Sequence, residues 1–245
     1  MSYQLHFAAQ YLAMAGKSFL KRRKDDRHTN LGFDPKTQSL ETWALDGKHL
    51  KLRFDLPNFQ LKWSTGESLA LDGKTHTQVV QWLQTSPQKL GLGKPYSFEL
   101  HYALPFEWDD DFTFKMDDSE EWDRFISLRS LANSVLSSFL KSEKLQAEVR
   151  IWPHHFDTGA FVVLEDGSGK SIGLGMAIPD TLVNDHYFYI SGYCGHDRLD
   201  TDTLKKLSLG GWENEGFKGA VLPASSVNEE EVVQFLKQAF EQLKS

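Results

Sequence analysis

The order of helical and strand-like segments is the feature that most constrains the fold of this chain. From Leu5 to Phe19, apolar residues recur at alternating steps of three and four, which predicts an amphipathic helix. Strand-like runs with turn signals follow, among them residues 28–34, 39–45 and 49–63. A short helix is predicted over 75–84. This succession is typical of a fold that combines helices with antiparallel strands.

The same succession appears again later in the chain. A buried stripe from Phe125 to Phe139 predicts a long helix, and the runs 147–152, 159–165, 170–178 and 186–193 then read as antiparallel strands. A final amphipathic helix is expected to begin near Asn228, where Glu231 completes a capping box. We therefore predict an α+β fold, mostly antiparallel sheet flanked by helices.

The repeated order also suggests how the chain is organised. We expect one compact unit over residues 1–245, with two similar halves over 1–90 and 118–245 and an irregular connection over 91–117. A short pattern of His, then Asn or Asp, then Gly occurs in both halves, beginning at His28 and at His155. An internal duplication would explain this pattern, and so would a chance match.

Charge limits the classes of function. The formal net charge is −7, whereas a protein that binds nucleic acid normally presents a basic face to the phosphates. We therefore expect no nucleic-acid partner. One basic cluster lies in residues 21–28, where Asp25 and Asp26 dilute it. Its cations complement the C-terminal dipole of the first predicted helix, and phosphate binding is the alternative.

The cellular compartment follows from cysteine usage and hydropathy. Cys194 is the only cysteine in the 245 residues, so an internal disulfide is impossible. The positive charges of the N-terminal segment come after its apolar run, which is the reverse of a signal peptide. No stretch approaches the length of apolar sequence that a membrane span requires. We predict a cytoplasmic protein with no membrane partner.

The most distinctive short motif is Trp-Pro-His-His-Phe-Asp at residues 152–157. In an extended strand, side chains two positions apart share a face, so His155 and Asp157 are expected to point the same way. A carboxylate beside an imidazole fixes its tautomer and raises its basicity. The sequence therefore predicts a catalytic pair with His155 as base and Asp157 as its orienter. The alternative is that both histidines bond only the backbone or solvent.

This motif also carries a resemblance. Together with residues 185–193 (DHYFYISGY) and 219–223 (GAVLP), it resembles a family of uncharacterised bacterial proteins with a Trp-Pro-His-His-Phe-Asp signature. The resemblance covers residues 150–225, and HTNLGF at 28–33 is a further landmark. The chain departs from the family at 191–197, where a Pro- and Tyr-rich end is more usual. The resemblance implies a shared site and no particular reaction.

Other residues are expected to line a pocket around this pair. Aromatic walls are predicted from Trp152, Tyr187 and Tyr189, with His154 as a further contact. A glycine face at Gly173 and Gly175 would admit a ligand, although packing of Trp152 or Tyr189 against it is the preferred interpretation. The predicted strand 96–104 adds a second pair that shares one face, consisting of Glu99 and His101.

These residues lead to three hypotheses about function. The first is binding, and in an enzymatic version turnover, of a small polar molecule at a His/Asp/aromatic pocket. The second is a non-catalytic module that binds a partner protein through its sheet. The third is a metal-dependent hydrolase with His155, Asp157, Glu99 and His101 as ligands, although none of the usual metal-binding spacings occurs. The sequence identifies no cofactor and leaves the oligomeric state open.

Overall fold

The computed structural model describes residues 2–116 and 119–245, and these form an α+β fold with two mostly antiparallel sheets. The chain divides into two compact units. The N-terminal unit comprises residues 1–130 and 151–156, and the C-terminal unit comprises residues 131–150 and 157–245. Helix α3 (Ser119–Ser142) and strand β6 (Arg150–Trp152) both contain the points where the chain passes from one unit to the other.

The N-terminal unit combines a meander sheet with helices. Its complete elements are α1 (Ser2–Phe19), β1 (Gly32–Asp34), β2 (Ser39–Glu41), β3 (Leu52–Asp55), β4 (Gln60–Trp63), β5 (Ser68–Ala70) and α2 (His76–Lys89). The strands follow one another in the sheet in chain order, each antiparallel to the next. Leu40, Phe54 and Leu61 lie opposite one another in adjacent strands and are fully buried. This row is part of the core of the unit.

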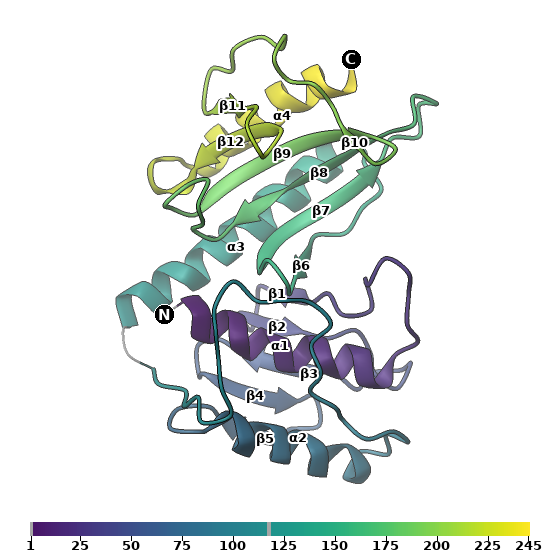
Figure 1. Cartoon of the computed structure of the whole chain (residues 1–245), viewed down its shortest axis with the longest axis vertical. Helices are drawn as coiled ribbons and strands as arrows, with labels where there is room; N and C mark the ends of the chain where they lie inside the picture. The colour runs from purple at the N-terminus through teal and green to yellow at the C-terminus, as the bar shows by residue number, and fades with distance from the viewer. Residues whose placement is uncertain (1, 117–118) are drawn as a thin grey trace. The chain divides into compact units, whose positions relative to one another are not determined.

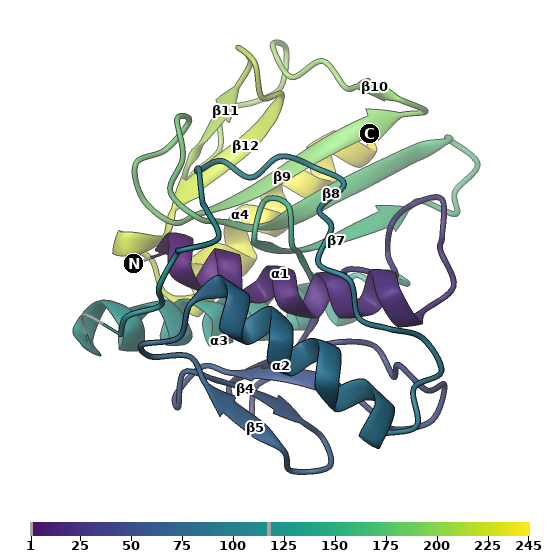
Figure 2. The same ribbon diagram turned by 60° about the horizontal axis from the view of Figure 1, so that its bottom comes forward.

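Helix α1 is the centre of the N-terminal unit. Its apolar stripe is buried from Leu5 to Ala15 and half-buried at Phe19, and polar positions on other faces, including Gln4, His6 and Gln10, are buried as well. Helices α1 and α2 lie side by side (Figure 2), where the Tyr11 hydroxyl is 2.9 Å from Nδ1 of His76. At Gly16 a β-carbon would collide with the carbonyl oxygen of His28, so glycine allows the following loop to pack against the helix.

The C-terminal unit contains the longer strands (Figure 1). Its complete elements are β7 (Asp157–Val163), β8 (Lys170–Ala177), β9 (Tyr187–Cys194), β10 (Asp197–Arg198), β11 (Gly211–Glu213), β12 (Gly219–Pro223), the 3-10 helix η1 (Ala224–Ser226) and α4 (Glu229–Lys244). The strand order is β11-β12-β9-β8-β7, with β10 paired to β9. Each pairing in this order is antiparallel.

The two faces of this sheet differ in composition. Helix α4 lies along one face (Figure 1), and a β-carbon built at Gly192 would come within 3.2 Å of Leu243 Cδ2. Apolar residues of β7 and β8 such as Val162 and Ile172 are buried on this face. On the opposite face, Phe161 and Val163 remain 50% and 65% exposed. One face therefore forms the core of the unit, and the other is exposed at Phe161 and Val163.

Most predicted elements are present, with one clear exception. The four helices form, and α4 has the predicted capping box between Asn228 and Glu231. The predicted strand over 96–104 is wrong, because residues 95–104 adopt no regular secondary structure. No helix within the described ranges has both the length and the hydropathy needed to cross a membrane.

Candidate functional site

The Trp-Pro-His-His-Phe-Asp motif forms a turn and not an extended strand. Strand β6 ends at Trp152 and β7 begins at Asp157, and between them the Phe156 amide donates to the Trp152 carbonyl at 2.6 Å. Phe156 has a φ of +59°, a left-handed conformation that is uncommon for a bulky residue. The two-residue alternation that predicted a common face for His155 and Asp157 does not apply here. That argument for the catalytic pair is therefore wrong.

The backbone of this turn is fixed by buried interactions within the N-terminal unit. The carbonyl of Pro153 accepts hydrogen bonds from Nε2 of His6 at 2.7 Å and from Nε2 of Gln10 at 2.8 Å. The carbonyl of Phe156 accepts a hydrogen bond from the guanidinium group of Arg129. The Phe156 ring stacks on His6, with ring centres 4.9 Å apart. The turn is thus held at both ends by residues of α1 and α3.

The protonation state of His6 determines how its ring anchors the turn. The pKa of His6 is lowered from 6.5 to about 4, chiefly by burial and in addition by the charge of Arg129, while the bond to Pro153 opposes the shift. The ring is therefore neutral near pH 7. Because a carbonyl oxygen only accepts hydrogen bonds, the neutral ring carries its proton on Nε2 and donates it to Pro153. This interaction assigns the tautomer.

While the turn's carbonyls point inward, its two histidine rings remain reachable. His155 is exposed, His154 is half-buried, and their ring centres are 4.3 Å apart. The Tyr102 ring lies 5.7 Å from that of His154 and 4.8 Å from that of His101. We use the name histidine cluster for a group of side chains from three segments of the N-terminal unit, namely Asp26, His28, His101, Tyr102, His154 and His155.

Burial lowers the pKa of two histidines of this cluster. The pKa of His154 is lowered from 6.5 to about 4, chiefly by burial and then by the neighbouring His155 and His101. Burial also lowers the pKa of His28, against the opposing effect of Asp26. Nε2 of His101 lies 3.6 Å from Oδ2 of Asp26. At neutral pH, His154 therefore offers one hydrogen-bond donor and one acceptor, and no charge.

The predicted pair of Glu99 and His101 does not form on a strand. Side chains of α1 bind the backbone of this segment: Ser18 contacts Ser97, and Lys17 donates to the Glu99 carbonyl at 2.5 Å. The Glu99 carboxylate lies 3.5 Å from the Lys17 ammonium group, whereas His101 is next to Asp26. These contacts satisfy polar groups that a strand would pair in a ladder, so the segment remains irregular.

Three of the predicted residues lie in the C-terminal unit. The Tyr189 hydroxyl donates a hydrogen bond to Oδ2 of the buried Asp157, and the Tyr187 hydroxyl donates to Asp180 at 2.8 Å. Burial, followed by the Asp157 charge, raises the pKa of Tyr189 well above its ordinary value. Burial and the Asp180 contact likewise raise the pKa of Tyr187. Both hydroxyls stay protonated and act as donors.

Tyr189 also explains the glycine face of β8. A β-carbon at Gly175 would lie 2.7 Å from the Tyr189 hydroxyl oxygen, and one at Gly159 would lie 3.0 Å from it. The two positions are directly opposite each other in β7 and β8. The bare backbone therefore accommodates a tyrosine ring. The prediction that packing, rather than a ligand, fills this face is confirmed at Gly175.

The predicted pocket residues are thus divided between the two units. The N-terminal unit contains Glu99, His101, Trp152, His154 and His155, and the C-terminal unit contains Asp157, Tyr187 and Tyr189. Sequence reasoning missed Asp26 and Tyr102 as neighbours of the histidines. It noted His28 only in the short pattern shared by the two halves. Within the described part of the chain, no three His, Cys, Asp or Glu side chains are grouped as a metal site.

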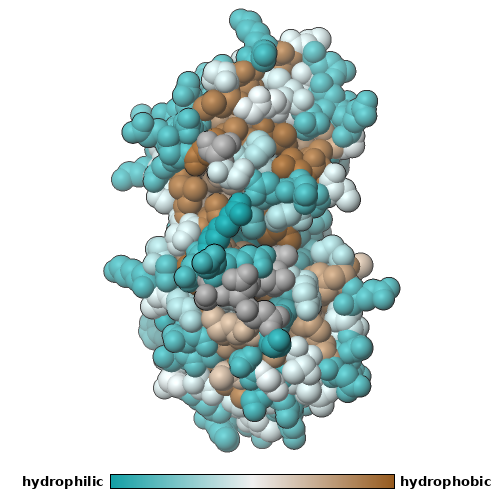
Figure 3. Space-filling view, turned by 90° about the vertical axis from the view of Figure 1, so that its left-hand side faces the viewer, coloured by the Kyte–Doolittle hydropathy of each residue, from teal (hydrophilic) through white to brown (hydrophobic). Residues whose placement is uncertain are grey.

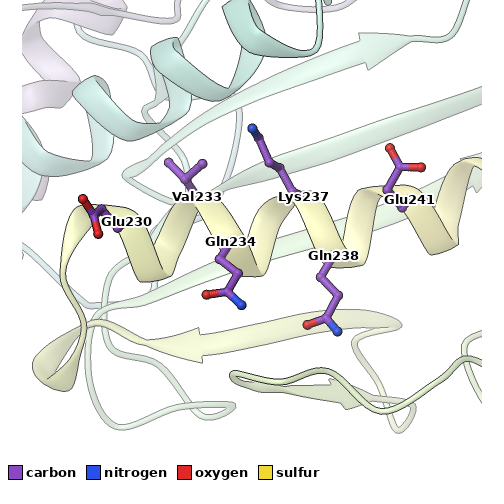
Figure 4. A pocket seen from close by; sticks show the side chains of 6 residues that line it. All are labelled: Glu230, Val233, Gln234, Lys237, Gln238 and Glu241. Atoms are coloured by element: carbon purple, nitrogen blue, oxygen red, sulfur yellow. The ribbon is translucent and has the colours of Figure 1, made fainter.

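Two surface hollows lie away from the predicted residues. One, of about 530 Å³, runs along α4 (Figure 4), where Val233, Lys237 and Glu241 point to one side and Gln234 and Gln238 to the other. Lys237 is 3.9 Å from Glu143, and Gln238 accepts hydrogen bonds from Ser208, so these polar groups already have partners. The second, of about 240 Å³, includes Gln38, Trp122 and Asp123 in the N-terminal unit.

In the space-filling view, hydrophobic surface is interrupted by hydrophilic side chains (Figure 3). Comparison of the chain with protein-family models, with curated proteins and with solved structures found no match. The histidine cluster is therefore argued from its own geometry.

Proposed function

We propose that the histidine cluster binds a small polar molecule. The observation that carries this proposal is the contrast within the turn at 153–156. The carbonyls of Pro153 and Phe156 are anchored by buried donors, whereas between them His155 is exposed and His154 is half-buried. Anchored backbone beneath reachable polar rings is the arrangement that fixes the orientation of a bound molecule.

The polar groups of the cluster suit binding better than proton abstraction. The Tyr102 hydroxyl donates to Oε1 of Gln10 at 2.6 Å, which fixes the phenol and leaves its oxygen able to accept. A general base is most effective when its pKa is close to the working pH. His154, with a pKa of about 4, is a weak base at neutral pH. We therefore place recognition ahead of turnover.

An enzymatic version of the proposal keeps His155 as base and Asp157 as orienter. The turn geometry gives this pair no support, since the common face deduced for an extended strand is lost. Asp157 accepts a hydrogen bond from the Tyr189 hydroxyl. Catalysis by the pair consequently rests on the sequence motif alone.

Thermal stabilisation by a panel of small molecules tests the proposal. The panel should contain sugars, amino acids, amines and oxyanions, and we expect one class to raise the melting temperature of the wild-type protein. The His154→Gln and His155→Gln variants should lose this rise, whereas His49→Gln, which alters an exposed histidine of the same unit outside the cluster, should retain it. A stabilising molecule that acts equally on all variants would bind elsewhere and contradict the proposal.

A second candidate function is a non-catalytic module that binds another protein. The supporting observation is the exposure of Phe161 and Val163 on the sheet face opposite α4, because large apolar groups gathered on a surface mark interaction sites. The partner to test first is another copy of the chain. Sedimentation velocity should show self-association that Phe161→Ser weakens, and a monomer at all concentrations would remove this partner.

We also propose a cytoplasmic location. The supporting observation is that Cys194, the only cysteine, is exposed and free, which suits a reducing compartment. Cell fractionation tests this directly, and recovery of the protein from an oxidising compartment would contradict it.

A further inference from the structure

The charges around the histidine cluster restrict the class of molecule that it would bind. Residues 21–27 contain five cationic and two acidic side chains, in a chain whose formal net charge is −7. Lys21, Arg22, Arg23 and Lys24 are exposed. Of the two acids, Asp25 contacts Arg27 at 2.6 Å and Asp26 lies next to His101. The segment therefore presents a local excess of positive charge.

This basic segment adjoins the cluster directly. The Arg23 amide lies 3.4 Å from Nδ1 of His28, and the charge of Arg22 acts on the same ring. Asp26 adopts a φ of +51° where the segment turns toward His101. The basic segment and the imidazoles thus form one continuous polar region in the N-terminal unit.

Imidazoles, cations and the carboxylates Asp25 and Asp26 act on the rings of the cluster. His154 faces His155, His101 and Asp26. His28 faces His101, Arg22, Asp25 and Asp26. The adjoining His6 faces Arg129, His154 and His155. The Asp26 carboxylate thus acts on both His154 and His28.

Such a region is short of negative charge. In the free protein, burial holds the pKa of His154 and of His28 below the ordinary value, so these rings are uncharged at neutral pH. An anion placed beside them would favour their protonated forms, because an opposite charge within a few ångströms raises the pKa of an imidazole. Each protonated ring would then donate from both nitrogen atoms.

We propose that the histidine cluster binds a small oxyanion and takes up a proton as the anion binds. This inference rests on the proposed function and names its ligand class. Exposed cations of residues 21–24 attract the anion, and imidazole N–H groups of the cluster hold it. Because proton uptake accompanies anion binding, the anion binds more tightly as the pH falls.

Sulfate is the probe that tests the inference, because its charge stays constant between pH 5.5 and 7.5. Isothermal titration calorimetry at both pH values, with chloride at matched ionic strength as the reference, measures the affinity. If binding restores the pKa of one imidazole from about 4 to its ordinary value, linkage predicts about tenfold tighter binding at the lower pH. Titrations in buffers of different ionisation enthalpy should show proton uptake.

Two variants within the cluster separate its contribution from general charge effects. His154→Gln should weaken sulfate binding and reduce its pH dependence. His155→Gln, at an exposed position where loss of folding is not expected, should weaken binding as well. His49→Gln should behave as wild type. Circular dichroism confirms that each variant is folded.

The outcomes also distinguish this inference from the proposed function. Equal sulfate affinity at both pH values, or undiminished binding by both cluster variants, would overturn the inference. If an uncharged panel molecule binds in a His154-dependent manner while sulfate does not, the proposed function stands and the oxyanion assignment falls. If neither binds, both fall.

Discussion

Acidification is expected to destabilise the N-terminal unit, with His6 as a main cause. This histidine is 1% exposed, and its Nε2 donates to the Pro153 carbonyl. Its pKa is lowered from 6.5 to about 4, chiefly by burial. In the unfolded chain the same side chain takes up a proton at a pH near its ordinary value. Between the two values the unfolded state binds more protons, so stability rises with pH across this window.

The magnitude follows from the two pKa values. At pH 7 both states are largely unprotonated at His6, and the difference contributes little. At pH 5 the unfolded side chain is protonated and the folded one is not, so linkage gives a loss of about 2 kcal/mol between pH 7 and pH 5. The loss is complete below about pH 4. Above about pH 6.5, His6 contributes little to the pH dependence of stability.

Urea unfolding at pH 7 and pH 5 measures this effect when wild type is compared with His6→Gln. Glutamine keeps an N–H donor for the Pro153 carbonyl but does not titrate. Loss of the stacking on Phe156 lowers the stability of the variant at both pH values and therefore cancels in the difference. The acid-induced loss should be about 2 kcal/mol smaller in His6→Gln than in wild type.

His49→Gln provides the matched control, because His49 is exposed in the same unit. It should show the full wild-type loss on acidification. Other histidines with lowered pKa values, such as His76 and His154, contribute equally to all three proteins. An acid-induced loss of the same size in His6→Gln and wild type would refute the reasoning, because a buried neutral His6 could not then be present.

Three further predictions concern the C-terminal unit, each measured by urea unfolding against wild type. Gly175→Ala should destabilise it by about 1–3 kcal/mol, because the added methyl group meets both the Thr158 carbonyl oxygen and the Tyr189 hydroxyl, and an unchanged stability would mean that these groups do not cover the glycine. Tyr189→Phe should lower the free energy of unfolding by about 1–3 kcal/mol, because it removes a hydrogen-bond donor from the buried Asp157. An unchanged free energy would mean that solvent reaches this carboxylate. Asn228→Ala should cost about 1 kcal/mol through loss of the α4 cap, with Asn228→Asp, which can still accept from the Glu231 amide, as a conservative control expected to stay near wild type.

Elements with a strong local signal were predictable from the sequence. The cap of α4 is an example, because Asn228 and Glu231 interact within one turn of helix. The apolar stripe of α1 was predicted as well, but the burial of its polar side chains was not. His6 and Gln10 are buried because they bind the carbonyl of Pro153, more than a hundred residues away in the chain. Periodicity contains no information about such a partner.

The two errors at the candidate site have related physical causes. The strand predicted over 96–104 fails because side chains of α1 bind its backbone, with Ser18 on Ser97 and Lys17 on Glu99. The common face of His155 and Asp157 fails because Phe156 adopts a left-handed conformation. Residue alternation predicts which side chains share a face only where the chain is extended, and neither segment is extended. Tertiary contacts, rather than local propensity, decide the backbone there.

In the turn at 153–156, backbone carbonyls anchor the chain, whereas the histidine side chains are the groups proposed to bind a ligand. Pro153 has no amide hydrogen to satisfy, and its carbonyl oxygen has two lone pairs that receive His6 and Gln10. The left-handed φ of Phe156 is energetically costly, and burial of its ring against His6 and beneath the Arg129 guanidinium group offsets that cost. With both ends held in this way, the exposed His155 side chain is not needed to hold the turn. Replacing His155 should therefore change binding with little effect on stability, whereas replacing Phe156 should do the reverse.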